Sequence, residues 1–334
     1  MTLVQQKGFT SDKKNDKVCT LNIESFCLGT YFREFLNHSL ERPMKSKIII
    51  LGAGGQLGSD CLHVLSKQYQ TIGYAHNQLD ICNPIMLQKR LSVFQPDIII
   101  NCAAFTRVDD CEILTDHAYE INEKGPRILA QIASELGSKL IHISTDYVFD
   151  GKRQIPEGYV ESDPSCPISV YGKSKRAGEQ AIMESTNQFI IIRTAWLFGM
   201  NGNNFFKTMY KLGKSDAIPF LKVINTQYGS FTHTIDLARQ IEHLINKDGQ
   251  GIYHASGEGY CTWYDGAAYF FKKMGIKKEV QACTEKEFPT KATRPTNSIL
   301  WNQRLIDDNM NLMPHWQKAL DNYIALFKAN LIHS

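Results

Sequence analysis

The sequence has few of the features that mark membrane, fibrous or disulfide-bonded proteins. No apolar run approaches the ~20 residues of a membrane span, and the chain contains neither an internal repeat nor a low-complexity tract. The net charge is only +3, which gives no electrostatic argument for nucleic acid or an anionic membrane as a partner. The nine cysteines are scattered without CxxC or metal-ligand spacing, which favours reduced thiols in a cytoplasmic protein and predicts no metal site.

What is present is typical of a globular protein with one large domain or two modest ones: 334 residues, 43% hydrophobic and 21% charged. Residues 1–43 fit poorly with the rest, and Arg33 and Glu34 interrupt their only apolar patch, so a signal peptide is not predicted. Met44 is followed at once by KSKIIILGAGG. We therefore expect an N-terminal extension over 1–43 that is disordered or precedes the start of the functional domain.

A glycine-rich turn follows the first predicted strand, residues 48–51, and leads into a helical pattern. In a dinucleotide-binding turn, Gly52 allows the tight bend, Gly55 lets the backbone approach a pyrophosphate, and Gly58 lets the helix pack on the strand. Such glycines alone often mark an ordinary turn. The strand before them and the helix after them favour a cofactor site.

The second predicted strand, residues 71–75, ends without the acidic residue that usually binds the ribose of NAD. His76 stands near that place and could approach a 2′-phosphate, so NADPH is allowed and NADH remains an alternative. His76 could equally be an ordinary exposed histidine. Asp80 could reach the adenine, or it could cap a turn.

Strand and helix patterns alternate through residue 200 and predict an α/β fold with a doubly wound parallel sheet. We expect residues 44–200 to form an NAD(P)-binding domain of Rossmann type. After Gly202 the pattern loosens, which predicts a small C-terminal substrate-binding lobe over 201–330, with some chain returning to the sheet.

Tyr171 and Lys175 are four residues apart on a predicted helix and therefore share one face. An ammonium beside a phenol favours the phenolate, which brings a weak acid closer to useful acid/base range. Thr145 follows a predicted strand over 140–143 and could hydrogen-bond the same reacting oxygen. A YxxxK pair by itself is usually a surface pair, so this interpretation depends on the hydride carrier predicted upstream.

Three further positions are candidates for contact with ligands. Ala104 lies in NCAAFT, where a strand end allows a cofactor to approach closely, although a plain buried strand end is the alternative. Trp196 follows a strand and could stack on a sugar or base, or belong to the core. Arg294 lies in a loop and could bind a diphosphate, although most loop arginines are merely solvated.

Taken in order, these motifs resemble the extended short-chain dehydrogenase/reductases, and within them the dTDP-4-dehydrorhamnose reductases. The matching segments run from about residue 47 to 326: GxxGQLG at 52–58, LDI at 79–81, NxAAxTxVDxxE at 101–112, ISTDYVFDG at 143–151, YGKSKRAGE at 171–179, RTAWLFG at 193–199, GIYHASGEG at 251–259, TRPTNS at 293–298 and PHW at 314–316.

The resemblance implies NAD(P)H-dependent reduction of the C4 keto group of dTDP-4-dehydro-L-rhamnose, in the synthesis of nucleotide sugars for surface polysaccharides. Tyr171 would be the proton donor, assisted by Lys175 and Thr145. The implied cofactor contacts, besides the glycines, are Gln56, Leu57, Asp80, Ile81, Ala104, Phe105, Thr106, Tyr171 and Lys175. Thr145, Asp146 and Trp196 would contact the nucleotide sugar. Some homologues form a homodimer through a metal, for which no residues are assigned here.

The sequence departs from that family at two places in one turn. Thr226 replaces the usual aspartate of the DQxG turn, and Phe231 replaces the proline of a PT pair. Both changes concern nucleotide-sugar contacts and leave the hydride chemistry intact.

Two other classes of function remain in competition: a non-catalytic regulatory subunit, and an NAD-retaining epimerase or dehydratase. A non-catalytic regulatory subunit, like the methionine adenosyltransferase β subunit, would share the fold, but the presence of Thr145 and Trp196 favours an enzyme. An NAD-retaining epimerase would usually keep an acid where Ala75 stands, and a dehydratase would place a glutamate beside Asp146, where Tyr147 stands.

Overall fold

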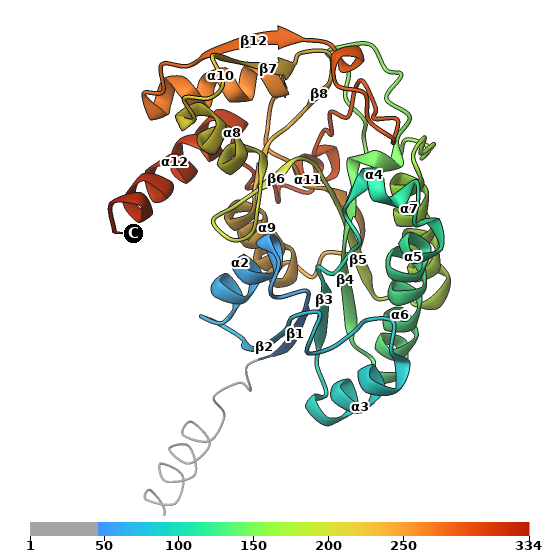
Figure 1. Cartoon of the computed structure of the whole chain (residues 1–334). Helices are drawn as coiled ribbons and strands as arrows, with labels where there is room; N and C mark the ends of the chain where they lie inside the picture. Colours follow the sequence, from blue (N-terminus) through green and yellow to red (C-terminus); the bar gives the residue numbers. More distant parts are fainter. Residues whose placement is uncertain (1–45, 334) are drawn as a thin grey trace, which may run out of the picture. The chain divides into compact units, whose positions relative to one another are not determined.

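A computed structural model of the chain describes residues 46–333; the predicted extension over 1–43 lies outside this range. A six-stranded sheet lies at its centre, in the order β10-β5-β4-β3-β1-β2, and each neighbouring pair is parallel. Its strands are β1 (Lys47–Leu51), β2 (Gln70–Tyr74), β3 (Ile98–Asn101), β4 (Lys139–Thr145), β5 (Phe189–Thr194) and β10 (Gly251–His254) (Figure 1).

Isoleucine fills both faces of this sheet because successive side chains of a strand point to opposite sides. In β1, Ile48 and Ile50 face one hydrophobic core, while Ile49 and Leu51 face another. All four side chains are fully buried. A strand buried on both faces reads as a continuous apolar run, which is why the sequence pattern predicted these strands well.

Helices cover both faces of the sheet, which confirms the predicted doubly wound α/β fold of Rossmann type (Figure 1). One core includes residues of α2 (Gln56–Leu65), α9 (Thr234–Asn246) and α11 (Gln303–Asp307). The other includes residues of α3 (Pro84–Phe94), α6 (Gly125–Leu136) and α7 (Val170–Ser185).

The helix predicted over residues 122–136 begins earlier in the structure. The chain runs without a break from α5 (Thr115–Tyr119) through a π-helical turn (Glu120–Lys124) into α6; a short α4 (Val108–Cys111) precedes them. The π turn carries Asn122, whose buried amide bonds both backbone groups of Phe105. Such turns often mark functional sites, and this one ties a helix to the loop that follows β3.

The C-terminal lobe is built around aromatic rings instead of a large sheet. Its strands form three two-stranded sheets: β6 (Leu197–Phe198) with β9 (Thr232–His233), β7 (Phe220–Ile224) with β12 (Glu279–Cys283), and β8 (Tyr228–Gly229) with β11 (Cys261–Thr262). Its helices are α8 (Phe205–Lys214), α10 (Trp263–Met274) and α12 (Trp316–His333). Phe206, Phe231 and Phe270 lie in its core.

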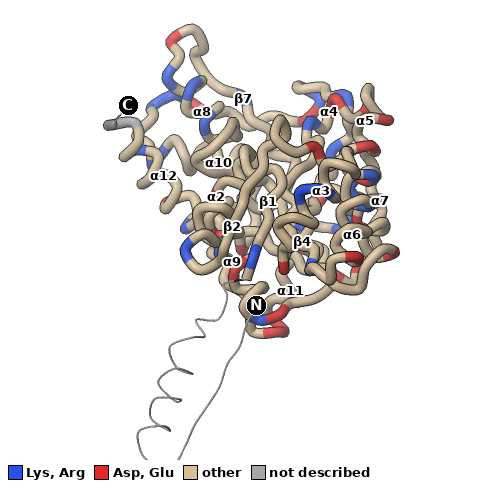
Figure 2. The backbone as a smooth tube through the Cα atoms, turned by 90° about the horizontal axis from the view of Figure 1, so that it is seen from below, with Lys and Arg blue, Asp and Glu red and all other residues tan. Residues whose placement is uncertain are grey.

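Charges of both signs are intermixed over the described part of the chain, as Figure 2 shows for Lys, Arg, Asp and Glu. Within residues 46–333, no helix is both long and apolar enough to cross a membrane. The cysteines of the same range, Cys61, Cys82, Cys102, Cys111, Cys166, Cys261 and Cys283, are free thiols.

Candidate active site

A cleft of about 450 Å³ lies where the carboxyl ends of the central strands meet the lobe. In open parallel sheets, ligands bind at this edge, next to the point where the strand order reverses. Here that point lies between β1 and β3. The residues around the cleft come from six segments: Gly55, Gln56, Leu57, Gly58, Cys102, Ala104, Thr106, Val108, Ile143, Ser144, Thr145, Asp146, Tyr147, Tyr171, Lys175, Thr194, Ala195, Trp196, Leu197 and Trp263.

The glycine turn has the geometry that a bound pyrophosphate requires. Gly52 has a φ of +76°, and a Cβ there would lie 2.7 Å from the backbone nitrogen of Ala103. A Cβ on Gly58 would lie 2.2 Å from the carbonyl oxygen of Gly52, so only glycine lets the helix approach the strand. Gly55 is the N-cap of α2 and provides no side-chain cap. The N–H groups of the first helical turn can therefore bind an anion.

The predicted adenosine contacts lie outside this cleft. His76 is exposed just beyond the end of β2. Asp80 is exposed, and its carboxylate accepts a hydrogen bond from the backbone of Cys82, as in a turn. Ile81 is buried against Gly125. The turn alternative for Asp80 is thus visible in the structure, whereas a contact with adenine remains a prediction.

The loop after β3 divides its side chains between the cleft and the interior. Ala104 and Thr106 border the cleft. Phe105 is buried between them, and its N–H and C=O bond the side chain of Asn122 at 2.8 and 3.0 Å. The same amide donates to the hydroxyl of Ser174 on α7, also at 3.0 Å. Asn122 therefore connects the cofactor loop to the helix that carries the predicted acid. Sequence reasoning missed this role because the connection spans distant parts of the chain.

Tyr171, Lys175 and Thr145 meet on one side of the cleft. Ser169 caps α7 by accepting from the N–H of Gly172 at 3.1 Å, so the helix begins just before Tyr171. Burial raises the pKa of Tyr171, and a hydrogen bond with Thr145 offsets part of that rise. Burial also lowers the pKa of Lys175 to about 8. The sequence predicted that the Lys175 ammonium would lower the pKa of Tyr171. In the free protein, burial instead raises the pKa of Tyr171.

Asp146 and Trp196 also border the cleft. Asp146 is 3% exposed, and burial raises the pKa of its carboxyl to about 6. Thr145 donates to its Oδ1 at 3.0 Å, while Oδ2 has no hydrogen-bond partner among the described residues. Trp196 has a φ of +46°, unusual for so large a side chain, which marks a constrained position at the cleft.

Trp263 is a cleft residue that the sequence predictions did not include. Its ring stacks on Trp196 with centroids 3.8 Å apart and an interplanar angle of 13°. Thr262 and Asp265 form a capping box that places Trp263 in the first turn of α10. A TxxD pattern before an apolar run can be found in sequence, but it does not show which cleft the first residue faces.

Arg294 is paired with a carboxylate in the structure, and its contact with a diphosphate remains a prediction. Its guanidinium forms an ion pair with Asp109 at 2.7 Å and does not border the cleft. The two departures from the family pattern are also explained by their surroundings. Thr226 donates to Glu285. Phe231 packs against Trp196 and Trp263, and a Cβ on Gly266 would lie 2.2 Å from its ring.

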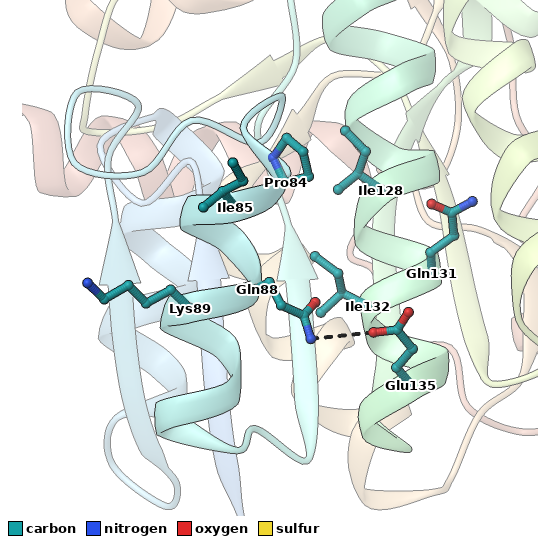
Figure 3. A pocket seen from close by; sticks show the side chains of 8 residues that line it. All are labelled: Pro84, Ile85, Gln88, Lys89, Ile128, Gln131, Ile132 and Glu135. Carbon is teal, nitrogen blue, oxygen red and sulfur yellow. Dashed lines mark hydrogen bonds between the residues drawn. The ribbon is translucent and has the colours of Figure 1, made fainter.

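A second hollow lies between α3 and α6 (Figure 3). Ile128 and Ile132 point from α6 toward α3, and Gln88 donates to Glu135 at 3.4 Å. This groove contains no nucleophile or acid/base pair and does not include any of the predicted site residues. Within residues 46–333, no group of three or more His, Cys, Asp or Glu side chains has an arrangement that could hold a metal.

The chain is similar in sequence to curated proteins of polysaccharide and nucleotide-sugar biosynthesis. SpsK, a spore coat polysaccharide biosynthesis protein of Bacillus subtilis (strain 168), is 39% identical over 84% of this chain and 97% of its own. A dTDP-4-dehydrorhamnose reductase of Aggregatibacter actinomycetemcomitans is 38% identical over 84% of this chain and 99% of its own.

Among solved structures, a dTDP-4-dehydrorhamnose reductase of Bacillus anthracis in complex with NADP superposes with a TM-score of 0.81 at 40% identity, over 84% of this chain and 99% of that one. The family described as the RmlD substrate binding domain matches residues 46–329, which contain the whole glycine turn, the Tyr171–Lys175 pair and the aromatic side of the cleft. The chain therefore belongs to this family of nucleotide-sugar reductases.

Proposed function

We propose that this protein uses NADPH to reduce the C4 keto group of dTDP-4-dehydro-L-rhamnose to the alcohol of dTDP-L-rhamnose. The observation that carries the proposal is one cleft that joins a glycine turn suited to a pyrophosphate, an acid/base pair and an aromatic wall. The relatives named dTDP-4-dehydrorhamnose reductase support the choice of substrate, and the NADP complex of one relative supports the cofactor.

The glycine turn and the first turn of α2 would hold the cofactor diphosphate through Gly55, Gln56 and Leu57. A reduced nicotinamide bound here supplies the hydride. Ala104 and Thr106 would border the rest of the cofactor, and Lys175 would bond its ribose. We propose that His76, Asp80 and Ile81 contact the adenosine end of the cofactor. These residues lie outside the cleft of the free protein.

The chain's own residues would then handle one proton. The Tyr171 hydroxyl would donate its proton to the C4 oxygen as negative charge develops there. The Thr145 hydroxyl, which donates to Asp146 in the free protein, would turn to donate its hydrogen bond to the same oxygen. The raised pKa of Tyr171 keeps the phenol protonated before the reaction, as a general acid must be. Tyr171 regains a proton from the cleft, and Lys175 is the adjacent group that can relay it.

On the sugar side, Asp146 has a buried carboxylate oxygen that could accept a hydrogen bond from a sugar hydroxyl. The paired rings of Trp196 and Trp263 form an apolar wall against which a deoxy sugar or a base could pack. Arg294 would contact the substrate diphosphate with N–H donors that its ion pair with Asp109 leaves free.

The test is a spectrophotometric assay of the full chain with NADPH and enzymatically generated dTDP-4-dehydro-L-rhamnose. We expect a fall in reduced-nicotinamide absorbance that requires the sugar nucleotide. NADH in parallel measures cofactor preference. If NADPH binds but no keto sugar accelerates its oxidation, the protein is not this reductase, and the regulatory-subunit interpretation would take its place.

A second sugar sharpens the assay. One relative, 32% identical and from Streptomyces niveus, is named dTDP-4-keto-6-deoxy-D-glucose reductase. We expect kcat/KM to be higher for dTDP-4-dehydro-L-rhamnose than for dTDP-4-keto-6-deoxy-D-glucose. The reverse order would keep the reaction class and overturn the assigned sugar.

A further inference from the structure

A buried chain of polar side chains runs behind Lys175, away from the cleft. The Nζ atom of Lys175 lies 3.2 Å from Nε2 of His142, and Nδ1 of His142 lies 3.1 Å from Nδ2 of Asn101. Lys175 also donates to the carbonyl oxygen of Ile143 at 2.7 Å. His142 and Asn101 are both fully buried, so no water competes for these contacts, and each hydrogen atom in the chain must be accounted for.

The backbone sets the direction of this chain from one end. The N–H of Ala103 donates to Oδ1 of Asn101 at 3.0 Å, which fixes the orientation of the amide. The other end of the amide, Nδ2, is therefore a donor that points at Nδ1 of His142. Burial lowers the pKa of His142 well below its usual value, so the ring is neutral. A neutral ring that accepts at Nδ1 carries its single hydrogen on Nε2.

That hydrogen points at Lys175. An ammonium group has three N–H donors and no lone pair, whereas a free amine has a lone pair that can accept. If Lys175 were charged, Nε2 would have to accept, and Nδ1–H would then face the amide hydrogens of Asn101. If the Asn101 amide were flipped, its NH₂ group would instead face the N–H of Ala103, which is also a donor. Either arrangement leaves two buried donors facing each other, which costs the desolvation energy of an unmade hydrogen bond.

We propose that Asn101 and His142 are positioning residues that weaken the hold of Lys175 on its proton in the free protein. The importance of this arrangement for catalysis rests on the proposed function. Each reduction consumes one proton, and Tyr171 must regain one after every turnover. An ordinary lysine, with a pKa near ~10.4, holds its proton too tightly to pass it on at neutral pH. A lysine with a weakly held proton can take one from water and return it to the phenolate.

The acidic neighbours of Lys175 act in the opposite direction on its pKa. Glu179, one turn along α7, raises the pKa of Lys175, as does Cys102 after β3. The Glu179 carboxylate is already committed to Arg193 at 2.8 Å and to Arg176 at 3.2 Å. Tyr171, on the same helix, is kept neutral by burial. Burial lowers the pKa of Lys175, and the donor on His142 acts in the same direction.

The first experiment reads the tautomer of His142 directly. Long-range ¹H–¹⁵N spectra of histidine-labelled protein distinguish a neutral ring protonated at Nε2 from one protonated at Nδ1. The signals of His142 are assigned by their loss in His142→Gln. We expect the Nε2–H form in the wild-type protein without ligands. The Nδ1–H form would overturn the proposal, and this measurement needs no variant of Asn101 to fold.

The second experiment follows Lys175 by ¹³C NMR of protein labelled at the lysine ε-carbons, with the signal assigned by its loss in Lys175→Met. In Asn101→Leu the His142 ring is free to turn its lone pair toward the amine. We expect the titration midpoint of Lys175 to rise by about one pH unit, the scale of one hydrogen bond. Added apolar burial alone would lower it, so an unchanged or lower midpoint contradicts the proposal.

Asn302→Leu is the matched control, because Asn302 is a buried asparagine bonded to Ser256 and Glu258, away from the cleft. We expect it to leave the Lys175 midpoint unchanged; a shift equal to that of Asn101→Leu would mean a general effect of altered packing. Neither experiment uses turnover or cofactor. A failed reductase assay would therefore overturn the proposed function without bearing on the tautomer of His142. The Nδ1–H tautomer would overturn this inference without bearing on the reductase activity.

Discussion

The two walls of the cleft are built by different kinds of interaction. The wall from β4 and α7 is held by buried hydrogen bonds, among them those of Asn122 and of the Glu179–Arg193 pair. The wall from the lobe consists of rings, with Trp196 and Trp263 stacked in front of Phe231. Hydrogen bonds fix the position of an atom to within tenths of an ångström, whereas stacked rings fill space and tolerate small shifts.

This difference matches what each wall would do in the proposed reaction. Proton transfer needs a donor within hydrogen-bond reach of one particular oxygen, and polar networks provide that accuracy. Recognition of a sugar nucleotide needs a broad surface that excludes water. Changes in the polar wall should therefore affect stability and turnover strongly, while changes in the aromatic wall should mainly weaken substrate binding.

The largest effect is expected from breaking the buried ion pair. Arg193 is 2% exposed and donates to both oxygens of the fully buried Glu179, at 2.9 and 2.8 Å. Arg193→Leu leaves a buried carboxylate without its main partner and should lower the free energy of unfolding by about 3–5 kcal/mol. Urea denaturation measures it. Arg127→Leu, at a partly exposed pair between α6 and the π turn, is the control and should cost less than ~1 kcal/mol. Equal losses in the two variants would contradict the predicted difference.

The next largest effect concerns turnover. Tyr171→Phe removes the proton donor and should lower kcat by about 10²-fold or more. Cofactor binding, followed by quenching of tryptophan fluorescence, should be retained. Tyr69→Phe removes an exposed hydroxyl bonded to Asn246, far from the cleft, and should leave kcat unchanged. Full activity in Tyr171→Phe would show that another group supplies the proton.

A smaller effect depends on pH. His254 is fully buried beside Arg193, and burial lowers its pKa to about 3. Because the folded pKa lies below the unfolded value near ~6.5, the unfolded chain binds the extra proton first and stability falls as the pH drops below that value, by up to about 1.4 kcal/mol per pH unit.

His254→Gln removes this titration, so between pH 6 and pH 5 the variant should lose less unfolding free energy than the wild type does. Urea denaturation at the two pH values gives the comparison, and acidic groups shared by both proteins cancel in the difference. Parallel pH profiles would mean that the pKa of His254 is the same in the folded and the unfolded protein, which would contradict the prediction.

The smallest effect is expected at the aromatic wall. Trp263→Leu removes the ring stacked on Trp196. A ring that stacks on a bound sugar or base would contribute about 0.5–1.5 kcal/mol to binding, so KM for the sugar nucleotide should rise by about 2- to 12-fold with a smaller change in kcat. Trp301→Leu, at a half-exposed tryptophan outside the cleft, should change neither constant. A larger loss in kcat than in KM would place Trp263 with the polar wall.

The aromatic wall also shows the limits of sequence reasoning. Trp196 stands just after a buried strand, and its placement at a strand end could be predicted from that position alone. Its partner Trp263 is 67 positions further along the chain, and no local pattern indicates that their rings meet. Phe231, which departs from the family's turn, lies behind both rings because Gly266 leaves room for it.

The sequence by itself determined the features that depend on local spacing. Runs of isoleucine specified the strands, three glycines specified the turn before α2, and a four-residue interval put Tyr171 and Lys175 on one helix face. Tertiary structure alone decided the features that join distant segments: His142 behind Lys175, Asn122 across to α7, and Arg294 committed to Asp109 instead of the cleft. The reason is physical, since backbone propensity acts over a few residues, whereas the partner of a buried polar group is whichever donor or acceptor the packed sheet and lobe bring within 3 Å.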